Sequence, residues 1–421
     1  MLRSMFSGVS GLRAHQSMMD VIGNNISNVN TAGYKSSQVV FEDLLSQVLR
    51  GAGSPQTTSG GTNPAQVGLG VRVGGISTSF SQGAAQLTGR STDLSISGDG
   101  FFYVKSQGQN YYTRLGNFSF DTNGRLVTPD GYVAQGWLAN NGVINTNAST
   151  ADLVMPLGQT LPPTQTTTLK LGGNLPADSP NATAITTSIT VYDANGKAIP
   201  ISFTFTKSAA DTWSVNATAP DAGNVTHTLP GFPQTLTFNA TTGVPTGGLT
   251  ALTVDGTLNT LLGTNFSTGT VSFDLGQAGQ LDSLLQFSGS NSVAAISQDG
   301  GAIGFLRSFN FSENGEITGV FSNGRTQAIG QIALASFNNP AGLQKSGAST
   351  YQSTVNSGLA AVGTAGSGGR GTLSGGTLEM SNVDLAQEFT NLIVAQRGFQ
   401  ANSRVITASD EMLQDLVNLK R

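Results

Sequence analysis

The chain has no cysteine and very little charge. Its 421 residues include two histidines and two tryptophans, and Asp, Glu, Lys and Arg together make up only 10%, against roughly 25% in ordinary soluble proteins. The absence of cysteine excludes disulfides, thiolate catalysis and thiolate metal sites. The formal net charge of −4 argues against nucleic-acid binding. The surface must therefore consist largely of hydroxyl and amide groups, which can slide past neighbours without breaking ion pairs.

Long apolar runs are also missing. No stretch of about 20 apolar residues is present, so no membrane-spanning helix is expected. The N-terminus lacks the unbroken apolar segment of a secretory signal peptide, and its apolar residues follow a helical period instead. If the protein is exported, we therefore expect a route that does not cleave a signal peptide.

Few residues offer catalytic or metal-binding chemistry. The histidines, His15 and His227, are separated by most of the chain, whereas a triad or metal cluster needs several such groups together. Residues 121–124 and 193–196 resemble the start of a calcium loop but lack its glutamate at position twelve, and their Asn-Gly dipeptides favour hairpin turns. Residues 68–75 miss the third glycine and the helix of a dinucleotide loop. We predict no catalytic residue, cofactor or metal, and hence no enzyme.

The two ends of the chain carry matching apolar patterns. Residues alternately three and four apart form a heptad stripe at each end, as in helices that pack against other helices. The N-terminal stripe comprises Leu2, Met5, Val9, Leu12, Gln16, Met19, Gly23 and Ile26, and the C-terminal stripe Phe389, Leu392, Gln396, Phe399, Ser403, Ile406, Asp410, Leu413 and Val417. Both stripes contain polar members and both helices have further apolar residues, which favours several partners over one coiled-coil partner.

The predicted helices have recognisable ends. The first is expected over residues 2–29, with Gly33 as a left-handed exit. The second is expected to begin around Ser381–Asp384, where Ser381 and Asp384 have the spacing of a capping box, and to end near Lys420 and Arg421, which suit the negative pole of the helix dipole. If the helices pair within one chain, they run antiparallel.

Between the helices the sequence predicts β-structure. Residues 71–145 and 285–358 share alternating strands with Asn-Gly turns, which indicates two halves of one β-domain. Residues 146–284 have strands of their own and are interpreted as a second β-domain inserted into the first. Residues 35–70 and 359–371 are assigned to connecting segments, and 1–34 with 372–421 to a helical inner domain. The predicted fold is mostly β with terminal, coiled-coil-like helices.

Several segments resemble one protein family. Residues 20–35 (DVIGNNISNVNTAGYK) and 381–403 resemble the N- and C-terminal signatures of bacterial flagellar rod and hook proteins. Residues 94–102 and 112–118 are similar to the opening of that family's β-domain. The motif positions carried over from the resemblance are Asn24, Asn25, Asn28, Asn30, Thr31, Gly33, Tyr34 and Lys35.

The resemblance implies a function. Within this family the inserted domain distinguishes a hook protein from a distal rod protein. A hook protein polymerises into a hollow, flexible tube, a universal joint that transmits motor torque to the filament, with the terminal helices inside and the β-domains outside. The resemblance also implies an extracellular location in the hook and basal body. Unfolded subunits would leave through the flagellar type III apparatus, and Phe41 and Leu45 match its Phe-x-x-x-hydrophobic recognition element.

The implied partners are copies of the same chain, rod, hook-cap and hook–filament junction proteins, and the export apparatus. Three alternatives remain open at this point. The chain could be a distal rod protein. It could be a secreted β-rich adhesin or carbohydrate-binding module, with the helices serving as a stalk. A hydrolase is the third, although no paired-acid motif supports it.

Overall fold

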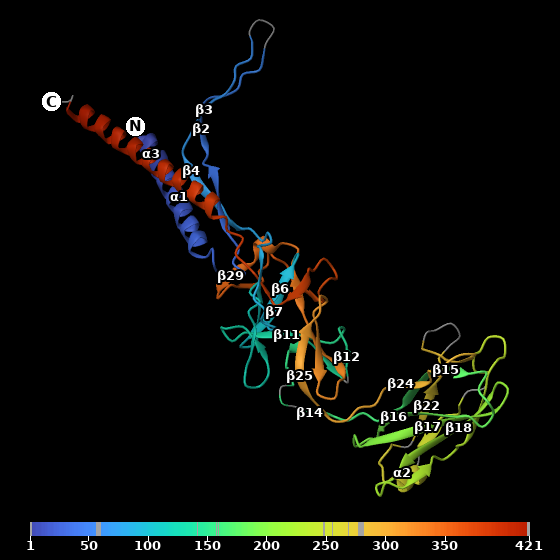
Figure 1. Cartoon of the computed structure of the whole chain (residues 1–421). Coiled ribbons are helices and arrows are strands. Elements are labelled where there is room, and N and C mark those ends of the chain that lie inside the picture. Colours follow the sequence, from blue (N-terminus) through green and yellow to red (C-terminus); the bar gives the residue numbers. More distant parts are fainter. Residues whose placement is uncertain are drawn as a thin grey trace. The chain divides into compact units, whose positions relative to one another are not determined.

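The computed structural model describes residues 2–55, 60–140, 142–156, 158, 160–246, 249–254, 256–267, 269–276 and 282–418. The chain divides into two compact units: residues 1–155, 309–318 and 328–421 form the first, and residues 156–308 and 319–327 form the second. The fold is mostly β, with a long helix near each end, which confirms the predicted fold class (Figure 1).

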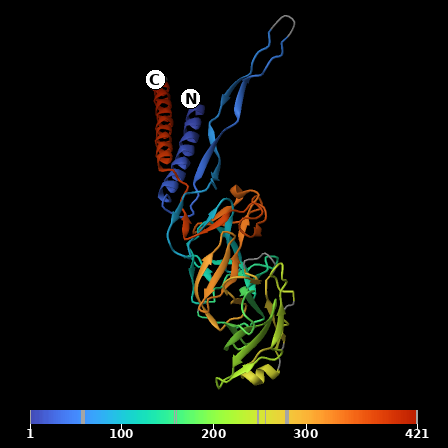
Figure 2. The ribbon, with the colours of Figure 1, turned by 45° about the vertical axis from the view of Figure 1, so that its right-hand side comes forward.

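Two long helices belong to the first unit. Helices α1 (Leu2–Ser27) and α3 (Leu385–Asn418) lie side by side (Figures 1 and 2). Helix α1 ends at Ser27, after which the side-chain Nδ2 of Asn28 donates to the carbonyl of Asn24 at 2.9 Å. Helix α3 is capped by Asp384, whose Oδ1 accepts the amide N–H of Ala386 at 2.9 Å. The predicted cap at Ser381 is therefore wrong, because the Asp384 side chain itself satisfies the free amides.

The segment after α1 forms strands at residues 37–43, 46–50 and 65–68. Strands β1 (Ser37–Asp43) and β4 (Val71–Thr78) pair antiparallel, and β2 (Ser46–Arg50) and β3 (Ala65–Gly68) extend this ribbon. We call residues 37–55 and 60–78 the hairpin arm. Its base lies beside α1 (Figure 2), where the rings of Phe41 and His15 meet edge to face with centroids 5.6 Å apart.

The β-body of the first unit is built around one antiparallel sheet, whose strand order differs from the order of the strands in the sequence. In it three adjacent strands from residues 71–145 lie between strands from residues 326–363, in the order β27-β11-β7-β8-β30-β29. Its elements are β7 (Phe101–Ser106), β8 (Gln109–Thr113), β9 (Ser119–Phe120), β10 (Leu126–Val127), β11 (Val133–Asn140), β12 (Val143–Ile144), β13 (Ala151–Asp152), β27 (Thr326–Ile332), β28 (Leu334–Ser336), η1 (Pro340–Gly342), β29 (Gln344–Gly347), β30 (Thr350–Gln352) and β31 (Ala361–Gly363).

Two short ribbons link this sheet to the helices. In them β5 (Ala85–Leu87) pairs with β33 (Thr377–Glu379), and β6 (Leu94–Ser97) pairs with β32 (Thr372–Gly375). The adjoining core contains fully buried Leu94, Ile96 and Phe102. The rings of Phe102 and Phe118 meet edge to face with centroids 5.2 Å apart, an arrangement favoured by the charge distribution of aromatic rings.

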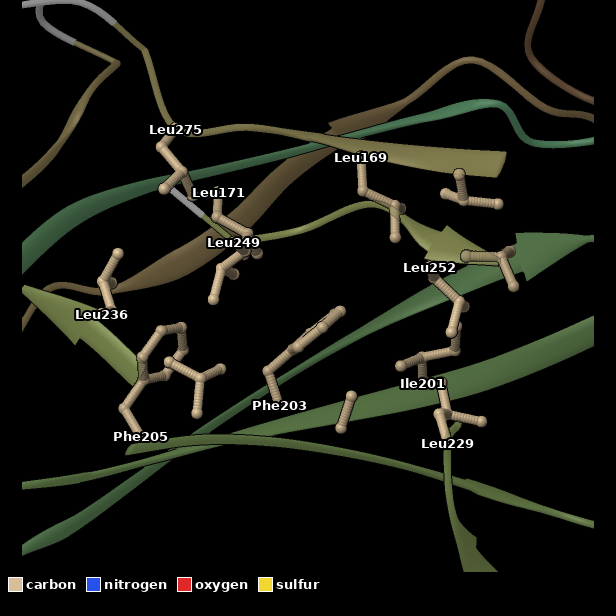
Figure 3. Close-up of a cluster of buried hydrophobic side chains, with 14 of the residues drawn as sticks. Leu169, Leu171, Ile201, Phe203, Phe205, Leu229, Leu236, Leu249, Leu252 and Leu275 are labelled. Carbon is tan, nitrogen blue, oxygen red and sulfur yellow. The ribbon is translucent and has the colours of Figure 1, made fainter. Parts of the chain in front are cut away.

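The second unit has its own core (Figure 3). Along β17 (Ala198–Ala209) every second residue is buried, including Phe203 and Phe205, because successive strand side chains point to opposite faces. Its other elements are β14 (Thr160–Leu161), β15 (Thr168–Pro176), β16 (Ala184–Tyr192), β18 (Thr212–Pro220), β19 (Thr226–Thr228), β20 (Gln234–Thr237), β21 (Leu252–Val254), α2 (Gly256–Leu262), β22 (Gly269–Asp274), β23 (Leu284–Phe287) and β24 (Ala294–Gln298).

The boundary of the second unit differs from the predicted insertion. Residues 285–308 fall in this unit, whereas the sequence analysis assigned them to the first β-domain. The reason is pairing: β23 and β24 both bond to β15. The chain passes between the units in strands β25 (Gly304–Phe311), β26 (Glu316–Phe321) and β27.

Candidate assembly helices and their buried junction

Helices α1 and α3 pack antiparallel through small residues. A Cβ at Gly8 would lie 3.1 Å from Cγ1 of Ile406, and one at Gly11 would lie 2.7 Å from the amide of Asn402. Farther along, a Cβ at Gly398 would collide with the His15 ring. Residue numbers rise along α1 as they fall along α3, so the helices are antiparallel. The glycines permit this close approach because they carry no side chain.

The face that α1 and α3 share is displaced from the predicted stripes. The buried helix positions are Gly8, Gly11, Ala14, Ile22 and Asn25 on α1 and Ala395 and Ser409 on α3, none of which is a stripe member. Within the predicted stripes Val9 and Phe389 are exposed. Met5, Leu12, Met19, Ile26, Leu392, Phe399, Ile406 and Leu413 are half-buried. Leu2 and Val417 lie outside the described side chains.

The polar stripe members Gln16, Gly23, Gln396, Ser403 and Asp410 are all exposed. Small residues form the contact between α1 and α3 because two helix axes approach most closely where the side chains between them are shortest. Among the larger apolar stripe side chains Ile406 packs against Gly8, and the other described ones are half-buried or exposed.

The motif segment after α1 is a hydrogen-bonded connector. Asn25 is 1% exposed. Its side-chain Nδ2 donates to the carbonyl of Ser37 and to Glu388 Oε1 at 3.0 Å, and its Oδ1 accepts the amide N–H of Ser37. The Tyr34 hydroxyl donates to Asn24 Oδ1 at 2.7 Å. These contacts tie α1, α3 and the hairpin arm together.

The remaining motif residues shape the turn. Thr31 Oγ1 donates to Asn28 Oδ1 at 3.2 Å, and Asn30 is exposed. Gly33 has φ +69°, and a Cβ there would lie 2.8 Å from the backbone nitrogen of Leu115. Only glycine satisfies both the left-handed backbone and the close approach.

A buried ion cluster lies directly after this turn. Lys35, Arg114 and Glu379 are each at most 2% exposed. Lys35 Nζ lies 2.7 Å from Glu379 Oε1, and Arg114 Nη1 lies 3.2 Å from Glu379 Oε2. The amide N–H of Gly83 also donates to Glu379 Oε1 at 2.9 Å. Burial lowers the pKa of Lys35, although hydrogen bonding and attraction to Glu379 act in the opposite direction.

The cluster joins distant parts of the chain. Lys35 precedes the hairpin arm, Arg114 belongs to the β-body and Glu379 lies just before α3. Asn382 reinforces the same place, because its amide donates to the carbonyl of Ser79 at 2.9 Å and accepts from the amide N–H of Ser36 at 2.8 Å. We call Lys35, Arg114, Glu379 and Asn382 the junction.

Sequence reasoning identified Lys35 as a motif residue but missed Glu379 as its partner. The sequence feature that could have pointed to Glu379 is that it is the one carboxylate within Thr377–Met380, in a chain with few charged residues. A buried charge is stable only when it is paired and hydrogen-bonded, but sequence alone does not show that Glu379 is buried.

The two residues proposed for export recognition lie in the hairpin arm. Phe41 is half-buried against His15, and Leu45 is 86% exposed. Recognition in an unfolded chain does not depend on this folded arrangement, so the prediction stays a prediction.

The Asn-Gly turns use their aspartates internally. Asp121 Oδ1 accepts the amide N–H groups of Asn123 and Arg125, and Asp193 Oδ1 accepts those of Asn195 and Lys197. Within the described residues no group of three or more His, Asp or Glu side chains is placed to hold a metal ion. None of the described helices has the length and apolar character needed to cross a bilayer.

Comparisons with known proteins match nearly the whole chain. Family models match residues 5–35 ("Flagella basal body rod protein"), 95–191 ("Flagellar hook protein FlgE/F/G D1 domain"), 160–301 ("Flagellar basal body protein FlaE D2 domain") and 374–419 ("Flagellar basal body rod FlgEFG protein C-terminal"). The flagellar hook protein FlgE of Borreliella burgdorferi is 41% identical over 100% of both chains. The chain belongs to the flagellar hook protein family.

Other relatives include both hook and rod proteins. The hook protein FlgE of Escherichia coli K12 is 36% identical over 98% of each chain, and the basal-body rod protein FlgG of Bacillus subtilis is 32% identical over 100% of each. The solved structure of Helicobacter pylori hook protein FlgE2 covers 70% of this chain and 100% of its own, with a TM-score of 0.52 and 16% identity, which supports the fold. The hook protein family is structural and not enzymatic.

Proposed function

We propose that this chain is the repeating subunit of the flagellar hook, a flexible helical tube that transmits torque, and that the outward faces of α1 and α3 bind neighbouring copies. The observation that carries the proposal is the displacement of the intrachain contact from the apolar stripes. Because small residues make that contact, large apolar side chains remain exposed on both helices.

These outward side chains are too many for a solitary helix pair. Phe6 is 71% exposed on α1, and Phe389, Ile393 and Met412 are 50%, 57% and 51% exposed on α3. Burying one such side chain contributes about 1.5–3 kcal/mol. A helix pair with apolar surface on several sides is stabilised by packing against more helices. In a homopolymer those helices come from other copies.

The junction supports a mechanical role. A subunit that transmits torque must pass force between its inner helices and its β-body without unfolding at the connection. The buried ion cluster and the Asn382 hydrogen bonds connect these parts at several atoms, whereas a single flexible linker would let them rotate freely.

A distal rod subunit is the second candidate, favoured by the full-length match to the B. subtilis rod protein. Rod and hook proteins have the same assembly requirement, so the helix proposal applies to both. Expressing this chain in a hook-deficient and in a rod-deficient strain would separate the two, because only the matching defect should be restored.

The proposal includes the location and partners implied by the family. The subunit would be exported through the flagellar type III apparatus and assemble outside the cell, in the hook and basal body. It would meet rod, hook-cap and hook–filament junction proteins at the ends of the tube. Phe41 and Leu45 remain the proposed export element, and secretion of a Phe41→Ser variant would test it.

The assembly surface is tested with the full chain. Phe389→Ser/Ile393→Ser should retain the monomer's circular dichroism and unfolding transition but raise the critical concentration for tube formation at least about tenfold, since two apolar contacts are lost. Val225→Ser, at a side chain 56% exposed in the second unit, is the control. Normal tubes from the double variant, seen by negative-stain electron microscopy at wild-type concentrations, would contradict the proposal.

A further inference from the structure

The loop between β30 and β31 exposes its two large aliphatic side chains. Val355 and Leu359 have exposed fractions of 104% and 94%, the two highest among the large apolar side chains in the described part of the chain. Between them Ser357 is 1% exposed, whereas Thr354 is half-buried and Asn356 is exposed. Single exposed apolar residues are common on protein surfaces, but an ordinary loop does not bury its serine and expose both of its aliphatic side chains.

Hydrogen bonds fix this loop in place. The Thr354 hydroxyl donates to the carbonyl of Gly342 at 2.6 Å. The backbone N–H of Thr354 donates to Ser357 Oγ at 2.9 Å. The side-chain amide of Asn339 donates to the carbonyl of Asn356 at 3.0 Å. A Cβ at Gly342 would lie 2.8 Å from the carbonyl carbon of Asn356, so the loop also packs tightly against the η1 turn.

A rigid apolar projection is well suited to binding. Docking a loop that is already ordered loses little conformational entropy, so more of the apolar burial remains as affinity. The loop exposes two aliphatic side chains and carries no charged residue over 352–360. The matching partner surface is therefore apolar rather than acidic, basic or sugar-like.

Strand addition at this place is blocked. Strand β31 is an edge that pairs only with β28 among the described strands. Arg370 covers that edge, because its guanidinium donates to the carbonyls of Ala361 at 3.3 Å and Thr364 at 3.0 Å. A charged residue on an edge strand prevents pairing with another strand. Contact at this loop must then occur through the side chains of Val355 and Leu359.

We infer that Val355 and Leu359 form a docking knob that inserts into an apolar surface of a second copy of this chain. The inference rests on the proposed function, since a helical homopolymer surrounds each β-body with other copies. Knob and receiving surface lie at different places on identical subunits. Such a heterologous contact builds an open helical assembly when its rotation does not close into a ring. The knob adds a contact on the β-body to the one made by the helices.

The first test compares matched full-length variants. Val355→Ser/Leu359→Ser should leave the unfolding transition of the monomer unchanged, because both side chains are already in water. It should raise the critical concentration for tube formation at least about tenfold. The control Val143→Ser/Leu87→Ser removes two side chains that are 72% and 78% exposed in the same unit, and should change that concentration less than about twofold.

The second test identifies the occupant. A photoreactive benzoylphenylalanine in place of Val355 should, after irradiation of assembled tubes, yield dimers in which mass spectrometry finds residue 355 joined to a second copy. Crosslinks only within one chain, or only to another protein in isolated hooks, would overturn the inference. So would wild-type assembly of the double variant. Failure of the unmodified chain to form tubes would instead count against the proposed function.

Discussion

Replacing Glu379 by glutamine tests how strongly the junction holds the first unit together. Glutamine keeps the shape of the side chain and an oxygen that can accept from Gly83 and Lys35, but it removes the negative charge. Lys35 and Arg114 would then be two buried cations, 0% and 2% exposed, without the anion between them. Removing one partner of a buried ion pair destabilises a protein by about 3–5 kcal/mol.

The matched control lies in the same unit. Glu42 pairs with Arg72 at 2.9 Å, and these side chains are 49% and 65% exposed. Glu42→Gln makes the same chemical change at an ion pair open to water and should reduce stability by less than about 1 kcal/mol. Urea unfolding of the monomer, followed by circular dichroism for both variants, measures the two free energies.

A double-mutant cycle tests the cause. Lys35→Met/Glu379→Gln should be more stable than the sum of the two single losses predicts, because methionine removes one of the stranded cations. The reasoning would be refuted if Glu379→Gln lowered the free energy of unfolding no more than Glu42→Gln, or if the two changes at the junction were simply additive.

Three further results are expected. Gly398→Leu should destabilise the helix pair by about 1–3 kcal/mol through overlap with His15, and the same change in a His15→Ala background should cost less, as measured by the helical signal on heating. Asp384→Ala should lower stability by about 1 kcal/mol through loss of the α3 cap; an unchanged melting temperature would contradict this role. Burial strongly raises the pKa of Tyr351, so the folded chain retains a proton that the unfolded chain releases above pH 10. The contribution of protonated Tyr351 to the free energy of unfolding is therefore fully present below pH 10 and is lost as the pH rises above it. Tyr351→Phe should therefore flatten the fall in stability between about pH 10.5 and 12 by up to about 1.4 kcal/mol per pH unit, and an unaltered slope in alkaline urea titrations would show that Tyr351 does not titrate in this way.

Local sequence features predicted much of the fold because they act over a few residues. Heptad spacing predicted both long helices, and alternation with Asn-Gly turns predicted strands such as β7 and β17. The motif at 24–35 marked the connector before its contacts were known. The cap at Asp384 was misassigned because two capping residues stand three apart, and the backbone geometry selects between them.

At the candidate assembly site, sequence patterns predicted that the helices need partners but not which face meets which partner. The stripes predicted that both helices need partners, since periodic apolar residues gain free energy only when buried. Which face meets which partner depended on how closely two axes can approach, and Gly8, Gly11 and Gly398 decided that. Likewise Lys35 was visible in the sequence, but its partner Glu379 lies 344 positions away. Helix formation follows from neighbours along the chain, whereas burial and ion pairing depend on neighbours in space, which only the tertiary structure brings together.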